Sequence, residues 1–328
     1  MSKIRAKIAG IGKYLPERIL TNEDLEKMVE TSDEWITKRV GIKERRIADE
    51  GVYTSDLARY AAENALKNAN MAPEDLDLIV VATVSPDMYT PSVSCHVQKY
   101  LGAVKAAAMD INAACSGFIF AVSTASKFIE TGTYKNALVI GADCLSKITE
   151  YKDRSTCVLF GDGAGAVVLT ATETENGVMS CVLGSDGAQG DCLTIAGLRV
   201  DEVEKERRPF GNPRTIWMDG GAVFKFAVRV MESATREVAE QGGVSLEDIK
   251  CIVPHQANQR IIEGARKRLG CEEEKIFSNV HKYGNMSGAS VPVALCEAIE
   301  EGRIQHGDKF VIVGFGGGLT WGSALIEY

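Results

Sequence analysis

Cys115 has the setting in this sequence that best suits a nucleophile. It lies in Asn112–Gly117, a segment of mainly small residues, and apolar residues follow it at helical spacing as far as Glu130. A strand ending near Asn112 and a helix beginning near Cys115 would place the sulfur at a helix N-terminus, where unpaired N–H groups favour thiolate over thiol. We therefore predict that Cys115 is the nucleophile. The alternative is a buried structural cysteine, the usual state of an intracellular cysteine.

His255 and Asn285 are two further candidates for chemistry. His255 directly follows the apolar run 252–254 and precedes a stretch rich in basic residues, and strand ends of this kind collect active-site groups in α/β folds. Asn285 lies in a turn bracketed by Gly284 and Gly288. Taken alone, a histidine is more often a satisfied surface or core residue, and a turn asparagine is more often structural.

The remaining histidines and the glycine runs favour neither a metal site nor a phosphate loop. His96, His281 and His306 have no partner at metal-ligand spacing, so we predict no metal. The glycine runs 161–166 and 316–322 lack a following Gly-Lys-Ser/Thr, and each leads into an apolar strand-like segment where a dinucleotide site needs a helix. We interpret both runs as tight turns with exposed backbone N–H groups.

The composition is that of an ordinary globular protein. The net charge of -8 over 328 residues argues against nucleic acid or anionic lipid as the partner of the whole surface. Nine cysteines are scattered and never form a C-x-x-C pair, which is typical of a reducing compartment. The N-terminus does not resemble a signal peptide, and no stretch approaches the roughly 18 apolar residues of a membrane span. We expect a cytoplasmic protein with no membrane or nucleic-acid partner.

Strand-like and helix-like segments alternate along the chain, which favours an α/β fold with a parallel or mixed sheet. A weak internal repeat accompanies the alternation. Glu74 and Glu247 begin similar segments, and so do Leu138 and Val311, and both pairs are separated by 173 positions. The repeat predicts two similar halves, residues 1–172 and 173–328. Chance resemblance between generic α/β segments is the alternative.

Together, the segments around Cys115, His255 and Asn285 resemble those of the thiolase superfamily. Within it, the chain resembles the β-ketoacyl-[acyl carrier protein] synthase III family of condensing enzymes. The resemblance runs nearly end to end and includes four more segments: Thr31–Ile36, Arg39–Arg45, Phe160–Ala166 and Phe315–Ala324. It implies a duplicated fold layered α-β-α-β-α with two mixed five-stranded sheets, the nucleophile in the first half, and the histidine and asparagine in the second.

The resemblance also implies an activity. Family members carry out the initiating decarboxylative Claisen condensation of type II fatty acid synthesis, in which an acyl-CoA primer and malonyl-[acyl carrier protein] give 3-oxoacyl-[acyl carrier protein], CoA and CO2. Cys115 would carry the acyl group as a thioester. His255 and Asn285 would donate hydrogen bonds to the enolate, and the N–H groups of Cys115 and Gly317 would form an oxyanion hole. No cofactor is implied, because the CoA thioester is a substrate.

The resemblance assigns residues to both substrates. An indole and two guanidiniums suit stacking and phosphate pairing with CoA, and polar or small residues would line its pantetheine arm. The implied CoA residues are Trp35, Arg39, Arg154, Gly220 and Asn258. A basic cluster in an acidic protein suits docking of the acidic carrier protein, the alternative being a solvated helix face. This cluster consists of Lys225, Arg260, Arg266, Lys267 and Arg268.

Thr90 is expected to influence the choice of primer. In the family this position caps the acyl pocket of the partner subunit of a homodimer, and acetyl-selective relatives often have phenylalanine there. The smaller Thr90 suggests room for branched or longer primers. A degradative thiolase is disfavoured, since it would have a second cysteine where Phe315 stands and a histidine in place of Asn285. A related Cys-His-Asn condensing enzyme of secondary metabolism stays open as the alternative.

Overall fold

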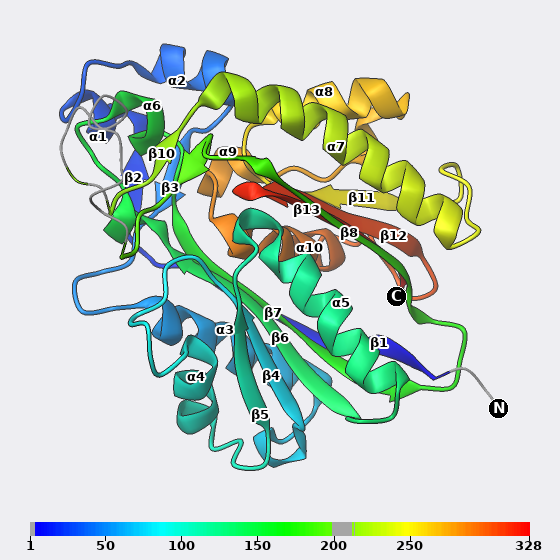
Figure 1. The fold of residues 1–328 in the computed structure, drawn as a ribbon. Helices are drawn as coiled ribbons and strands as arrows, with labels where there is room; N and C mark the ends of the chain where they lie inside the picture. Colours follow the sequence, from blue (N-terminus) through cyan, green and yellow to red (C-terminus); the bar gives the residue numbers. More distant parts are fainter. Residues whose placement is uncertain (1–3, 199–211, 213) are drawn as a thin grey trace.

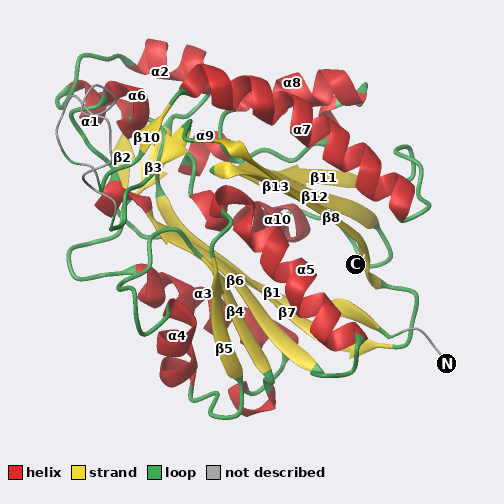
Figure 2. Ribbon diagram, in the orientation of Figure 1, coloured by secondary structure: helices red, strands yellow, loops and turns green. Residues whose placement is uncertain are grey.

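Two mixed β-sheets with two buried helices between them form the centre of the molecule (Figures 1 and 2). The computed structural model describes residues 4–198, 212 and 214–328. In Figure 1, α5 and α10 lie between the sheets, while other helices cover the two outer faces. The expected α-β-α-β-α layering is therefore confirmed.

The first sheet has five strands in the order β1-β7-β6-β4-β5. Neighbouring pairs β6–β4 and β4–β5 are parallel, whereas β1–β7 and β7–β6 are antiparallel. Strand β4, which lies between β6 and β5, is buried throughout, as its continuous apolar run requires of a strand covered on both faces. The bounds are β1 (Arg5–Tyr14), β4 (Leu78–Ala82), β5 (Ala107–Ile111), β6 (Asn136–Cys144) and β7 (Asp162–Thr172).

The second sheet follows the same pattern with one strand fewer among the described residues. Its order is β11-β12-β13-β8, with β11–β12 parallel and the other pairs antiparallel. Five strands were expected in each sheet from the family resemblance. The fifth position is occupied only by a single parallel bridge between Ile252 and Ile276, because the chain turns into helix α9 at Val280. The bounds are β8 (Gly177–Gly190), β11 (Cys251–Pro254), β12 (Lys309–Gly316) and β13 (Gly318–Glu327).

The helices fall into a central layer and two outer layers. Helices α5 and α10 contact strands of both sheets, α3 packs on the first sheet with α4 beside it, and α7 packs on the second sheet with α8 beside it. Nine consecutive residues of α10, from Ser290 to Ala298, are buried, as expected for a helix enclosed between two sheets. The bounds are α3 (Thr54–Ala69), α4 (Val93–Leu101), α5 (Gly117–Glu130), α7 (Gly220–Gln241), α8 (Gln259–Leu269) and α10 (Ser290–Glu300).

Many of the short elements are grouped at the upper left of Figure 1. They include two two-stranded sheets, β2–β3 and β9–β10. Among the described residues, none of the helices combines the length and apolar character that crossing a membrane requires. The short strands and helices are β2 (Ile19–Thr21), β3 (Glu44–Arg46), β9 (Leu193–Thr194), β10 (Trp217–Met218), α1 (Asn22–Glu26), α2 (Asp33–Val40), α6 (Arg154–Cys157) and α9 (Val280–Tyr283). The 3-10 turns are η1 (Pro73–Asp75), η2 (Ala114–Ser116), η3 (Leu145–Ile148), η5 (Glu273–Lys275) and η6 (Ser287–Ala289).

Candidate active site

One cavity of about 1070 Å³ brings Cys115, His255 and Asn285 together. This volume lies just above the range of roughly 300–1,000 Å³ that is usual for small-molecule sites. The three side chains come from equivalent ends of the two sheets: Cys115 follows β5, His255 follows β11, and Asn285 precedes η6. Residues as much as 170 positions apart in sequence, Cys115 and Asn285, thus line one cavity.

Cys115 lies in the 3-10 turn η2, which leads directly into helix α5 at Gly117. The helix therefore begins two residues later than the sequence indicated. Cys115 is 9% exposed, and burial raises the pKa of its thiol to about 12, with the nearby Asp143 raising it further and the Ser287 hydroxyl lowering it. The expectation that the helix start makes Cys115 a resting thiolate is wrong, because loss of hydration outweighs the favourable contacts.

His255 is fully buried and electrically neutral. Burial lowers the pKa of its imidazole to about 3. The backbone N–H donates to the Val313 carbonyl at 2.8 Å, and the ring lies 5.3 Å from that of Phe315 in an edge-on arrangement. Within the described part of the chain, neither ring nitrogen has a hydrogen-bond partner. A buried polar atom without a partner is unfavourable, so the imidazole is poised to bond to a ligand in the cavity.

Asn285 is held by backbone and side-chain hydrogen bonds. Its N–H donates to the Leu159 carbonyl at 2.9 Å, and its own carbonyl accepts from the N–H of Gly161 at 3.0 Å. The side-chain Oδ1 accepts from the N–H of Ser287 at 2.8 Å. Because the oxygen is bound to the backbone, the amide nitrogen is the end of the side chain that is left to donate.

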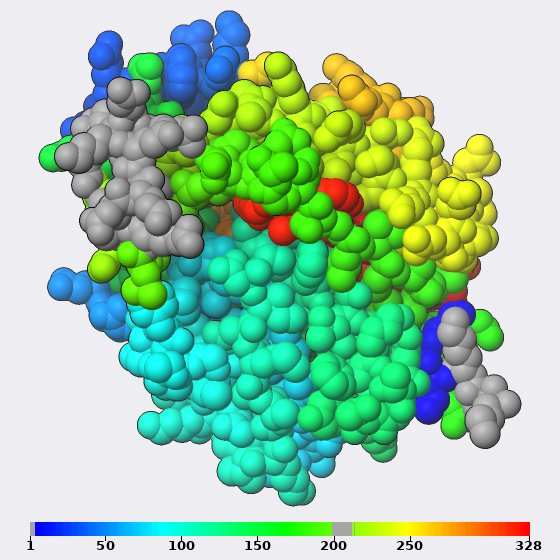
Figure 3. Space-filling view, viewed as in Figure 1, coloured from blue at the N-terminus to red at the C-terminus, as the bar shows by residue number. Residues whose placement is uncertain are grey.

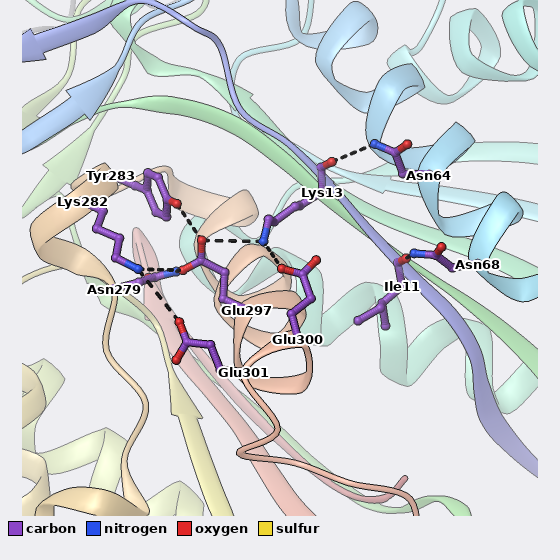
Figure 4. A network of polar contacts seen from close by, with 10 residues as sticks. All are labelled: Ile11, Lys13, Asn64, Asn68, Asn279, Lys282, Tyr283, Glu297, Glu300 and Glu301. Atoms are coloured by element: carbon purple, nitrogen blue, oxygen red, sulfur yellow. Dashed lines mark hydrogen bonds and ion pairs between the residues drawn. The ribbon is translucent and has the colours of Figure 1, made fainter.

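A buried carboxylate fixes the helix that precedes Asn285 (Figure 4). Glu297 on α10 accepts hydrogen bonds from Tyr283 Oη at 2.6 Å and from Asn279 Nδ2 at 3.0 Å. It also pairs with Lys13 of β1 at 3.6 Å and with Lys282 at 3.8 Å. Burial opposes its ionisation, but these donors and cations outweigh burial and lower the pKa of Glu297. The contacts tie α9, two residues before Asn285, to α10 and to the first sheet.

The two halves of the site repeat each other in backbone detail. Ala114 and Ser287 are 173 positions apart and have φ values of 48° and 47°, a left-handed conformation that is uncommon for residues with a side chain. Asn112 Oδ1 accepts from the N–H of Ala114 at 3.3 Å, just as Asn285 does from Ser287. The repeat therefore places Cys115 opposite Gly288, and Asn112 opposite Asn285.

The turn between β12 and β13 lies against the backbone of Cys115. A Cβ atom on Gly316 would stand 2.5 Å from the Cys115 nitrogen, so only glycine fits this approach. Gly316 lines the cavity, and the next residue, Gly317, does not. Among the described residues, the Gly317 N–H has no hydrogen-bond acceptor.

The five residues implied for CoA binding all line the cavity. The Arg154 guanidinium lies 5.0 Å above the Trp35 ring, and its Nη1 donates to the Glu30 carbonyl at 2.9 Å. Asn258 also caps α8, since its Oδ1 accepts from the N–H of Arg260 at 2.8 Å. The exposed indole and the arginines therefore lie on the same cavity as Cys115. The residues are Trp35, Arg39, Arg154, Gly220 and Asn258.

Only part of the basic cluster predicted for carrier-protein docking lies at the cavity. Lys225 and Arg260 line the cavity, whereas Arg266, Lys267 and Arg268 do not. Arg266 forms two hydrogen bonds with Glu263, both at 2.7 Å, and Lys267 lies 3.5 Å from the same carboxylate. Lys225 and Arg260 are thus more available to a partner than Arg266 and Lys267, whose charges are paired with Glu263.

Thr90 lies away from this cavity. It is exposed in the loop between β4 and α4 and is absent from the cavity lining. The family places this residue in a partner subunit's pocket, so the single chain leaves its role a prediction. Within the described ranges, no group of three or more His, Cys, Asp or Glu residues could hold a metal ion.

Three residues near the site had no recognised signal in the sequence. Asp143 is fully buried and accepts from Gly288 N, Thr320 contacts the loop around Cys115, and Ser287 faces the thiol. Ser287 could have been found from the repeat, because it is the counterpart of Ala114. Asp143 lies within a strand segment where nothing in the pattern distinguishes it from other strand residues. Thr320 lies within the glycine run 316–322, where the pattern indicated a tight turn and gave its hydroxyl no role.

Comparison with known proteins identifies this arrangement of fold and site. The layered, duplicated fold with a cysteine, a histidine and an asparagine at one cavity defines a thiolase-like condensing enzyme. Residues 109–187 match the family model described as "3-Oxoacyl-[acyl-carrier-protein (ACP)] synthase III", and residues 239–328 match its "C terminal" counterpart. The chain belongs to the β-ketoacyl-[acyl carrier protein] synthase III family.

Relatives of this family align with nearly the whole chain. β-Ketoacyl-[acyl-carrier-protein] synthase III of Caldanaerobacter subterraneus subsp. tengcongensis is 56% identical over 99% of this chain and 98% of its own length. That of Clostridium acetobutylicum is 53% identical over 98% of both chains. The crystal structure of 3-oxoacyl-[acyl-carrier-protein] synthase III from Aquifex aeolicus VF5 superposes with a TM-score of 0.92 at 48% identity, covering 98% of this chain and 100% of that one.

Proposed function

We propose that this chain performs the initiating condensation of type II fatty acid biosynthesis, joining an acyl-CoA primer to malonyl-[acyl carrier protein]. One observation supports the proposal above others: a buried thiol, a neutral imidazole and an oriented amide line a single cavity, and an exposed indole and two arginines line it too. The 56% identity to a synthase III over nearly the full chain favours this function over the related condensing enzymes of secondary metabolism.

In the first half-reaction, Cys115 attacks the acyl-CoA carbonyl carbon. The Cys115 S–C bond forms, the CoA S–C bond breaks, and the thiol proton ends on the departing CoA sulfur. Because the resting thiol is protonated and the imidazole of His255 is neutral, His255 is the group we assign to pass that proton. The N–H groups of Cys115 and Gly317 would stabilise the oxyanion that develops on the carbonyl.

In the second half-reaction, the malonyl thioester loses CO2 and its α-carbon attacks the acyl group on Cys115. The negative charge of the enolate develops on the malonyl thioester oxygen. A neutral imidazole carries one N–H donor, and the amide nitrogen of Asn285 carries two. Both would donate to this oxygen. Loss of CO2 leaves this carbon nucleophile. As the new carbon–carbon bond forms, the acyl–sulfur bond of Cys115 breaks, and the sulfur leaves as a thiolate that takes up a proton from solvent to restore the thiol.

The two substrates would contact different sets of residues at the mouth of the cavity. Trp35, Arg39 and Arg154 suit the adenine and phosphates of CoA, with Gly220 and Asn258 along the pantetheine arm. Lys225 and Arg260, with the neighbouring Arg266, Lys267 and Arg268, suit an acidic carrier protein. We further propose that the enzyme acts as a cytoplasmic homodimer in which Thr90 borders the partner's acyl pocket, and that it needs no metal or other cofactor.

A product assay tests the proposed function. The enzyme is incubated with acetyl-CoA and either malonyl-carrier protein or malonyl-CoA, and 3-oxoacyl products and CO2 are measured. We expect condensation with malonyl-carrier protein at a rate at least 10-fold above that with malonyl-CoA. Turnover with CoA esters alone would instead support a condensing enzyme of secondary metabolism.

A further inference from the structure

Thr320 joins the loop of the nucleophile to the glycine turn of the β12–β13 hairpin. Its Oγ1 lies 2.9 Å from the Ala113 carbonyl oxygen and 3.1 Å from the Gly317 carbonyl oxygen. It also lies 2.8 Å from Ser116 Oγ, which is itself 2.8 Å from the Ala113 carbonyl oxygen. One threonine side chain thus contacts backbone on both sides of the site, although Thr320 and Ala113 are 207 positions apart.

These contacts flank the two backbone N–H groups that we assign to the oxyanion hole. Ala113 precedes Cys115 by two residues, and the residue between them, Ala114, has its backbone in the left-handed region. On the other side, the bonded carbonyl belongs to Gly317 itself. A hydrogen bond from Thr320 to the Gly317 carbonyl, with Ser116 donating to Thr320, holds the peptide plane next to the Gly317 N–H against the residue that follows Cys115.

The glycine turn needs such a tether. Gly316, Gly317 and Gly318 are consecutive, and glycine has the largest backbone freedom of any residue. The turn has no side chains of its own to hold it, and Gly318 adopts a φ of 122°. Thr320 is two residues beyond the turn and is partly buried against the Cys115 loop. Its hydroxyl is therefore the side-chain group that links this turn to the nucleophile.

The hydroxyl protons suffice for this link. Thr320 and Ser116 each have one proton and two acceptor sites. If Ser116 donates to Thr320 and Thr320 donates to the Gly317 carbonyl, the two bonds connect the Cys115 loop to the glycine turn.

We infer that Thr320 is a positioning residue that sets the distance between the Cys115 N–H and the Gly317 N–H, and so the fit of the oxyanion hole. This inference rests on the proposed function, because the oxyanion is that of thioester acyl transfer. Thr320 should influence reactions in which an oxyanion develops, and should have little influence on other reactions of the Cys115 thiol.

Two reactions of the same sulfur separate this role from a merely structural one. Acylation by acetyl-CoA develops an oxyanion, whereas alkylation by iodoacetamide displaces iodide from a saturated carbon and develops none. Thr320→Val keeps the shape of the side chain and removes its hydroxyl. For this variant we expect acylation to slow by about 10- to 100-fold, a rate loss no larger than that caused by removing one oxyanion-hole donor. Alkylation should stay within about 2-fold of wild type, and Thr320→Ser should recover most of the acylation rate.

The matched control is Thr170→Val on β7, which removes a strand threonine hydroxyl that bonds to Asn136 at 2.7 Å and should leave both rates unchanged. If Thr320→Val does not fold, Ser116→Ala removes the other hydroxyl of the chain and should slow acylation selectively by a smaller factor. An unchanged acylation rate, or a parallel loss of acylation and alkylation, would overturn the inference. A wild-type enzyme that is alkylated and never acylated would instead overturn the proposed function.

Discussion

The Asp143 carboxylate of the first sheet accepts a hydrogen bond from the N–H of Gly288 at 2.9 Å. Its other oxygen accepts from Thr83 and from the loop residues Val84 and Ser85 at 2.8 to 3.1 Å. Asp143 is fully buried. A single carboxylate thereby joins β6, the end of β4 and the turn that follows Asn285, and couples the first sheet to the part of the site supplied by the second half of the sequence.

The contribution of Asp143 to the stability of the protein should decrease as pH rises, which is the opposite of the usual behaviour of a carboxyl group. Burial raises the pKa of Asp143 to about 6, above the value of about 3.9 in an unfolded chain. Between these values the folded protein holds a proton that the unfolded chain releases, so the contribution of Asp143 to stability falls as pH rises from about 4 to 6.

Urea unfolding of wild type and Asp143→Asn at several pH values measures this effect. We expect the variant to be less stable by about 2–4 kcal/mol. The NH2 group of the substituted amide would face the N–H and O–H donors that now bond to the two carboxylate oxygens of Asp143. The difference between the two proteins should shrink between pH 4.5 and 6.5. A difference that grows over that interval would contradict the raised pKa.

His255 should act as a neutral donor throughout the physiological range. Since burial lowers the pKa of His255 to about 3, the rate of malonyl decarboxylation should show no titration near pH 6.5. We expect His255→Ala to slow this step by about 100-fold or more, the usual loss for a donor to a developing oxyanion. The measurement is the pH profile of decarboxylation from pH 5 to 8. If the decarboxylation rate of wild type changed near pH 6.5 and that of His255→Ala did not, the imidazole would titrate in this range, which would contradict the prediction.

Glu297 should stabilise the fold only when it is ionised. Its pKa is lowered by its donors despite burial, so its contribution is present above the unfolded pKa of about 4.3 and is lost as pH falls through the lower folded pKa. We expect Glu297→Gln to reduce the free energy of unfolding by about 1–3 kcal/mol at pH 7. Glu300→Gln is the matched control, since the Glu300 side chain is 55% exposed and pairs with Lys13; exposed pairs contribute about 0–1 kcal/mol. Equal losses in the two variants would contradict the account.

Trp35 should be needed for CoA and not for the carrier protein. We expect Trp35→Ala to raise the KM for acetyl-CoA by about 10-fold, equivalent to about 1.4 kcal/mol, with the KM for malonyl-carrier protein changed less than 2-fold. Tyr53→Ala is the control: it removes another exposed aromatic ring that pairs with a cation, Lys147 at 4.8 Å, and that does not line the cavity. Steady-state kinetics with each substrate varied in turn gives both constants. A parallel rise in both KM values would argue against a separate CoA surface.

The sequence predicted the parts of this protein that repeat or that have distinctive residues. Apolar runs at Leu138 and Val311, which are 173 positions apart, indicated strands β6 and β12, and the structure places these strands at equivalent positions in the two sheets. The apolar residues that follow Cys115 at helical spacing indicated the helix that the structure shows as α5. These features are local, so a pattern within a few residues is enough to reveal them.

Properties that depend on three-dimensional surroundings were not accessible from the pattern. The pKa of Cys115 depends on how deeply α5 is enclosed between two sheets, and the local helix start indicated the opposite direction. The reduced fifth strand at Ile276 depends on where the chain turns into α9. Thr320 and Asp143 act through contacts with segments that are remote in sequence.

The central claim, that Cys115 carries the acyl group between the two half-reactions, is tested most directly by the mass of the intact protein. Wild type and Cys115→Ala are incubated with acetyl-CoA and then with malonyl-carrier protein, and the protein mass is recorded after each step. We predict that wild type gains one acetyl group and loses it in the second step as 3-oxoacyl-carrier protein forms, while Cys115→Ala gains none. An acetyl group that is still added to Cys115→Ala, or one on wild type that malonyl-carrier protein does not remove, would contradict the claim.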